Sequence, residues 1–96
     1  MPDYRLSESA KKDLIGIVQF GDAHFGVAQS NRYRDLLKQR FSVLADQPTL
    51  YPAVEHIRSG YRRSVCGVHS IYYRIEGDGV EIMRILKHQD AAESLA

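Results

Sequence analysis

The residues best suited to chemistry gather in one stretch of the sequence, positions 61–88. Each of its three β-prone runs contains arginine, and a lysine and a histidine follow the last run. The set comprises Arg62, Arg63, Arg74, Arg84, Lys87 and His88. Guanidinium and ammonium groups bind phosphates and carboxylates, and histidine exchanges a proton near neutral pH. The stretch therefore suits either an anion-binding site for nucleic acid or a docking face for an acidic protein.

RNA cleavage is the more demanding of these two readings. It needs a proton-transfer group, cations on the scissile phosphate and a ring that stacks on a base. The candidates are His88 for proton transfer, Arg62, Arg63, Arg84 and Lys87 for the phosphate, and Tyr61 or Tyr72 for stacking. A second acid–base group is not obvious, because Glu55 and His56 fall in an irregular segment. Catalytic groups need only meet in space, so a ribonuclease remains the alternative.

Strand geometry favours the protein-docking reading. Adjacent strand residues point to opposite faces, so at most one of Arg62 and Arg63 can reach a given site. For Arg74 we expect solvent or a neighbouring carboxylate such as Glu81. For Arg84 we expect a carboxylate, within the chain or on a partner, or a role in target binding. The candidate contact residues for a partner protein are Tyr61, Arg63, Tyr72, Arg84, Leu86, Lys87 and His88.

The length and composition limit what else the chain can be. Ninety-six residues predict a single domain over positions 1–96, and a formal net charge of +1 restricts nucleic-acid binding to a local patch. Cys66 is the single cysteine, for which a small buried apolar role is expected. The sequence predicts no metal site and no cofactor. Without a signal peptide or an apolar run long enough for a membrane, the expected location is the cytoplasm.

Two amphipathic helices are predicted ahead of the arginine-containing stretch. After an extended run at residues 4–6, Ser7 suits a helix N-cap, and apolar residues then recur at three- and four-residue steps. This predicts a helix over residues 8–25, with Gly26 at its end and Asp13 on the solvent side. A second apolar stripe predicts a helix over residues 27–46. The short joint between the helices favours an antiparallel hairpin.

The stretch itself predicts an antiparallel meander of three strands, at residues 62–66, 70–75 and 80–86. Residues 47–60 are irregular, with Val54 and Ile57 in the core, and residues 89–95 favour a last helical turn.

In the last strand, strict alternation places four side chains on one face: Val80, Ile82, Arg84 and Leu86. Neither face of this strand is cleanly polar, so we expect it to be central. The helical hairpin would cover one face, and the other would be a mixed apolar and basic surface that needs a partner. The fold class is α+β, with a helical hairpin packed on a small antiparallel sheet in the order β-α-α-β-β-β.

Three segments carry a resemblance to a known family. The opening reads YRLSESAKKDLIGI, the helical joint reads FGDAHFGVAQSNRYRDLL, and the most specific part is IRSGYRRSVCGVHSIYYRIEGDGVEIMRIL. Their order and spacing, spread over nearly the whole chain, resemble the ParE toxins of the RelE/ParE superfamily of type II toxin–antitoxin systems.

The resemblance implies a growth-inhibiting toxin that a neighbouring antitoxin gene neutralises. ParE-type members act on DNA gyrase, and RelE-type members are ribosome-dependent endoribonucleases of mRNA. The implied antitoxin is of the ribbon-helix-helix type, has a tail that folds on the toxin, and gives the complex its contact with operator DNA. The ending MRILKH is more similar to the ParE branch and lacks the tyrosine of several RNA-cleaving relatives. A gyrase-binding toxin without enzymatic activity is therefore expected, with the endoribonuclease as the alternative.

Overall fold

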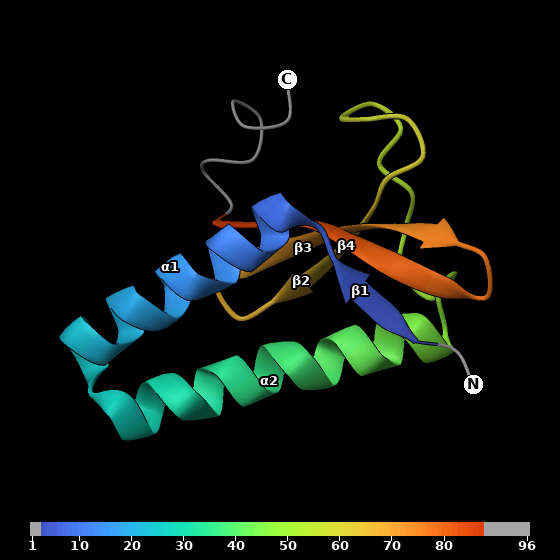
Figure 1. Ribbon diagram of the computed structural model, residues 1–96. Helices are drawn as coiled ribbons and strands as arrows, with labels where there is room; N and C mark the ends of the chain where they lie inside the picture. The colour runs from blue at the N-terminus through green and yellow to red at the C-terminus, as the bar shows by residue number, and fades with distance from the viewer. Residues whose placement is uncertain (1–2, 88–96) are drawn as a thin grey trace.

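Two helices form one layer of the molecule and a four-stranded sheet forms the other (Figure 1). The computed structural model describes residues 3–87. Its elements in chain order are β1 (Tyr4–Leu6), α1 (Glu8–Phe25), α2 (Val27–Asp46), β2 (Arg62–Cys66), β3 (His69–Glu76) and β4 (Gly79–Lys87). The predicted order of elements is confirmed. No helix within these residues combines the length and the apolarity that crossing a bilayer requires.

Local chemistry sets the limits of the helical hairpin. Ser7 Oγ accepts a hydrogen bond from Ala10 N at 3.0 Å and so caps the start of α1. The helix ends at Gly26, whose φ of 85° is readily adopted only by glycine. Where the helices pack, a Cβ at Gly21 would lie 2.7 Å from Ser30 Oγ. The absence of a side chain at position 21 therefore permits the close approach of α1 and α2.

The strands lie in the order β1-β4-β3-β2. The last three form the predicted antiparallel meander, and β4 is central as expected. The expectation of a wholly antiparallel sheet is wrong for one pair, because β1 runs parallel to β4. The chain leaves β1, passes through both helices and returns to the sheet, and such a crossover connection permits a parallel pair.

A β-bulge in β4 changes which side chains share a face. Tyr72 pairs with Arg84, but the next residue, Tyr73, pairs with Ile82, so Met83 is an extra residue in the ladder. The alternation is therefore shifted, and Ile85 joins Val80 and Ile82 in the core under the helices. The predicted common face of Val80, Ile82, Arg84 and Leu86 is wrong, because a strict alternation cannot anticipate an inserted residue.

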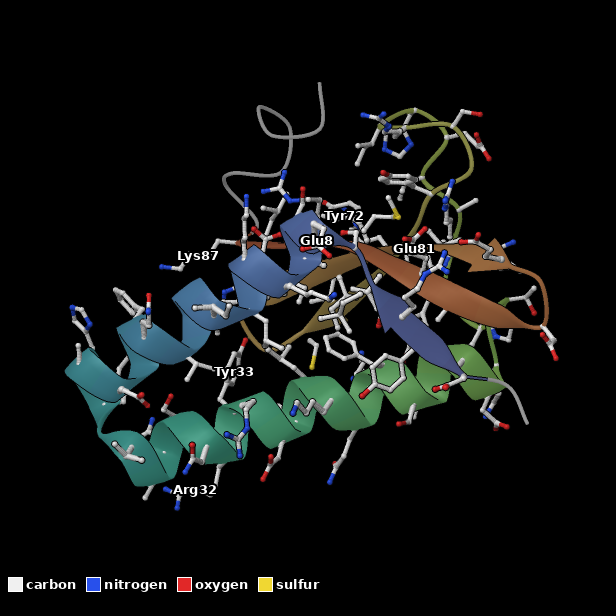
Figure 2. The ribbon with its side chains drawn as sticks, viewed as in Figure 1. Glu8, Arg32, Tyr33, Tyr72, Glu81 and Lys87 are labelled. Carbon is white, nitrogen blue, oxygen red and sulfur yellow. The ribbon has the colours of Figure 1, made fainter. Side chains whose placement is uncertain are left out.

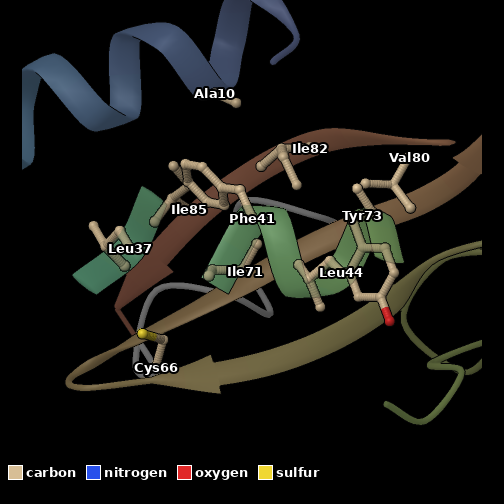
Figure 3. Close-up of a cluster of buried hydrophobic side chains, with 11 residues drawn as sticks. Ala10, Leu37, Phe41, Leu44, Cys66, Ile71, Tyr73, Val80, Ile82 and Ile85 are labelled. Carbon is tan, nitrogen blue, oxygen red and sulfur yellow. The ribbon is translucent and has the colours of Figure 1, made fainter. Parts of the chain in front are cut away.

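The main core lies between the helices and the inner face of the sheet (Figure 3). It contains Ala10, Leu37, Phe41, Leu44, Ala45, Cys66, Ile71, Tyr73, Val80, Ile82 and Ile85. The predicted burial of Cys66 is confirmed. This cluster fixes the orientation of the hairpin on the sheet and therefore the position of everything that projects beyond it.

A second, smaller cluster lies on the outer face of the sheet. Val54, Tyr61, Tyr72 and Leu86 are buried there, with Ile57 and Met83 packed against them. The segment 47–61 supplies this cover, held by a 2.8 Å bond from Val54 N to Tyr61 O. The predicted burial of Val54 is confirmed, and Ile57 is partly buried in the same cluster. The outer face is thus partly covered by the chain itself, where the sequence predicted a surface left open for a partner.

Candidate functional site

An apolar groove opens where the helical hairpin extends past the end of the sheet. It has a volume of about 1030 Å³ and is walled by α1, α2, the β2–β3 turn and the end of β4. Its apolar and glycine lining consists of Gly16, Ile17, Phe20, Gly21, Phe25, Leu36, Val68, Ile85 and Leu86. Its polar lining consists of Lys12, Asp13, Gln29, Ser30, Arg32, Tyr33, His69 and Lys87. A concave surface of this kind suits an apolar ligand segment with polar flanks.

Aromatic rings of α1 border the groove. Phe20 is 45% exposed and Phe25 is 58% exposed, although both are large apolar side chains. The imidazole of His24 stacks on Phe20 with ring centroids 3.9 Å apart. The ammonium of Lys87 lies 4.7 Å from the Phe20 centroid, and Figure 2 shows Lys87 extending from the end of β4. Apolar surface that the fold leaves uncovered in this way is typical of a binding site.

Tyr33 holds the opposite wall of the groove in place. Its hydroxyl donates to Cys66 O at 3.2 Å, accepts from Val68 N at 3.2 Å and lies 2.6 Å from His69 Nδ1. Burial raises the pKa of the Tyr33 hydroxyl, so it stays protonated. The Tyr33 ring fills the space that a Cβ at Gly67 would need. These contacts tie the β2–β3 turn to α2. His69 is the first residue of β3, one residue before the predicted start of that strand at residue 70.

Arg84 is paired within the chain. Its Nε donates to Asp13 Oδ2 at 2.8 Å and its Nη2 donates to Asp13 Oδ1 at 3.2 Å. The same Oδ2 accepts from Ile85 N at 3.0 Å, so the carboxylate also binds the edge of β4 beyond the three residues that pair with β1. The hydrogen bond to Asp13 raises the pKa of Arg84. Of the roles expected for Arg84, pairing with an internal carboxylate is confirmed, and the predicted solvent-side position of Asp13 is wrong.

The other candidate residues lie apart from the groove. Tyr72 is fully buried, and its hydroxyl has no hydrogen-bond partner among residues 3–87. Tyr61 is also buried, with the guanidinium of Arg58 over its ring at 5.5 Å. As the chain stands, neither ring is open for stacking on a base. Arg62 Nη1 donates to Tyr51 O at 2.7 Å.

Arg63 shares the outer face with Tyr72, its cross-strand partner. It is half-buried there, and its backbone N bonds to Pro52 O at 3.2 Å.

The remaining arginines of the sheet form a network of ion pairs at its outer face. Arg74 Nη2 lies 2.7 Å from Glu81 Oε1, which confirms the expected pairing. Arg5 and Glu76 extend the network through a 2.8 Å pair. The hydrogen bond from Arg74 lowers the pKa of Glu81. These charges are matched locally, so this part of the sheet is no general anion-binding surface.

The structure brings only two of the described candidates to the groove, Leu86 and Lys87. His88 and the predicted helical turn at residues 89–95 lie outside the described residues. The candidate residues predicted from the sequence do not include the helical side of the groove, where Phe20 and Tyr33 lie. The sequence held one sign of this side of the groove. Phe20 and His24 lie one helical turn apart, outside the predicted apolar stripe, so two rings could be expected to stack on the solvent side of the helix.

Comparisons with known proteins give matches over most of the chain. The sequence matches the family described as the ParE toxin of the type II toxin–antitoxin system parDE over residues 4–92. It is 39% identical over 89 residues to Toxin ParE1 of Caulobacter vibrioides, which covers 93% of this chain and 91% of that protein. It is 33% identical over 87 residues to Toxin ParE1 of Mycobacterium tuberculosis, which covers 90% of this chain and 88% of that protein.

Two solved structures share the fold. The chromosomal ParDE toxin–antitoxin system from P. aeruginosa has a chain that superposes with a TM-score of 0.78 at 17% identity, over 91% of this chain and 96% of that one. A chain of the toxin–antitoxin complex RelBE2 from M. tuberculosis gives a TM-score of 0.61 at 18% identity, over 92% of this chain and 100% of that one.

Proposed function

Because this chain belongs to the ParE toxin family of type II toxin–antitoxin systems, we propose that it inhibits growth by binding DNA gyrase. A cognate antitoxin of the ribbon-helix-helix type neutralises it and connects the complex to operator DNA. In this proposal the toxin acts in the cytoplasm as a binding inhibitor, with no reaction of its own.

The groove is the proposed binding site for the antitoxin. Two phenylalanines of its lining, Phe20 and Phe25, remain about half exposed, whereas the large apolar side chains of the main core are buried. A disordered antitoxin tail that folds as an amphipathic segment would bury these rings and recover the free energy that their exposure costs. This uncovered apolar surface is the observation on which the antitoxin site rests.

The dispersal of the charged groups supports gyrase over RNA as the target. A ribonuclease needs its cations to converge on one phosphate. Here Arg84 binds Asp13 at the edge of β4, Arg62 binds Tyr51 O, and Lys87 lies on Phe20 in the groove. These three candidates occupy separate surroundings within the described residues. A protein target, which can be contacted over a broad surface, suits this arrangement better.

A supercoiling assay tests the proposal. Purified chain added in molar excess to DNA gyrase should block the supercoiling of relaxed plasmid, and prior mixing with the antitoxin should restore it. Arg63→Ala, on the outer face and away from the groove, should weaken the block without loss of antitoxin binding. Lys38→Ala on the exposed side of α2 is the matched control and should leave both unchanged.

Two outcomes would overturn the gyrase target. One is full supercoiling in the presence of excess folded chain. The other is discrete cleavage of translated mRNA that His88→Ala abolishes, which would establish the endoribonuclease instead. Neither outcome affects the family assignment.

A further inference from the structure

The groove is more basic than the chain as a whole. The formal net charge of the protein is +1, yet Lys12, Arg32 and Lys87 all border this one surface. The carboxylate among its described lining residues is Asp13, which is already paired with Arg84. The apolar floor is therefore edged by three cations without a matching anion in the lining. Such a surface is complementary to an apolar segment with acidic residues along its flank.

Lys87 differs from the other two cations in its position. It is the last residue of β4, and its ammonium lies over the Phe20 ring, so its side chain spans the groove between the sheet and α1. A half-exposed ring attracts an ammonium only weakly, whereas a carboxylate forms a charge-assisted hydrogen bond with it. Within residues 3–87 Lys87 makes no ion pair with a carboxylate, so a carboxylate of a binding partner could form this stronger contact.

We propose that Lys87 is a specificity-determining residue for the antitoxin. Its ammonium leaves the Phe20 ring to bind an acidic side chain of the amphipathic antitoxin segment, and a neighbouring apolar side chain of that segment covers the ring. A segment without an acidic side chain at that place would either bury the Lys87 ammonium without a partner or leave it on the Phe20 ring, where it blocks the apolar contact. Both outcomes would weaken binding. This inference rests on the antitoxin binding proposed above.

The experiment measures the affinity of the full chain for the antitoxin encoded by the adjacent gene. Lys87→Met keeps the length and the apolar stem of the side chain and removes the charge. It should raise the Kd about tenfold at low salt and reduce the dependence of the Kd on salt. Lys87→Arg should restore most of the affinity and most of the salt dependence. Lys38→Met removes a charge outside the groove and should change the Kd little. Thermal melting of each variant confirms an intact fold.

Acid-to-amide substitutions in the antitoxin, made one at a time, identify the partner group. One of them should weaken binding to the wild-type chain but not to Lys87→Met, because the two changes remove the same contact.

Equal Kd values for Lys87→Met and Lys38→Met, with no coupled acid, would overturn the inference. So would tighter binding after removal of residues 88–96 with no effect of Lys87→Met, which would identify that segment as the occupant. Self-association through the groove would overturn it as well. A wild-type chain that does not bind the antitoxin would instead overturn the antitoxin site of the proposed function.

Discussion

The two ends of the helical hairpin use similar apolar residues for different purposes. At the end over the sheet, Leu37, Phe41 and Leu44 are fully buried in the main core. At the other end, which projects past the sheet, Phe25 and Val27 are more than half exposed. The difference lies in what each end faces, since only one of them has strands beneath it (Figure 1). We infer that the first end determines stability and that the second is left for a partner.

The largest effect should come from a paired truncation at the two ends. Phe41→Ala removes a fully buried ring from the main core and should lower the free energy of unfolding by about 3–5 kcal/mol. Phe25→Ala should change it by less than about 0.5 kcal/mol, because that ring is already in contact with water. Urea unfolding of both variants measures the contrast. Similar losses would mean that the two ends are not functionally distinct.

The second largest effect concerns Asp13, through which α1 is hydrogen-bonded to β4. Asp13→Ala removes the carboxylate shared by Arg84 and Ile85 N and should cost about 2 kcal/mol of unfolding free energy. Asp35→Ala removes a carboxylate of an exposed ion pair and should cost less than about 0.5 kcal/mol. The same urea experiment compares them. An Asp13→Ala variant as stable as Asp35→Ala would show that α1 is held by apolar packing alone.

Two glycines of α1 should change the stability of the fold by smaller amounts and in opposite directions when each is replaced by alanine. Gly21→Ala places a methyl group 2.7 Å from Ser30 Oγ, so the helices must move apart at a cost of about 1–3 kcal/mol. Gly16→Ala meets nothing within 4 Å and should stabilise the helix by up to about 1 kcal/mol. Thermal denaturation checks both signs. A stabilising Gly21→Ala would contradict the close packing of the hairpin.

The smallest effect concerns the ion pairs at the outer face. The folded chain lowers the pKa of Glu81 through Arg74, so the pair stabilises the fold above the ordinary pKa of a glutamate. That contribution is lost as the pH falls through the lowered pKa. Glu81→Gln should therefore lower the melting temperature slightly at neutral pH, and the variant and the wild-type chain should converge as the pH falls below about 4.3. Melting temperatures over this range measure the difference, and parallel curves for the two proteins would contradict it.

Local chemistry was sufficient to predict most of the secondary structure. The predicted bounds of α2 and β2 agree with the structure because Gly26 and the apolar stripe of α2, and Gly60 and Gly67 on either side of β2, act over a few residues. The Ser7 cap and the order of the elements followed from the same kind of signal. These features depend on neighbours in sequence, which a single chain displays directly.

Tertiary structure decided which of the charged residues are free to act. The sequence placed the arginines in the strands, but it did not show that Asp13 of α1 would reach Arg84, because the two lie 71 residues apart. The bulge at Met83 and the cover of Tyr72 by segment 47–61 also depend on packing between distant elements. The groove follows from the length of the hairpin relative to the sheet that it covers. Its aromatic floor and basic edge exist only when α1, α2 and the end of β4 are assembled.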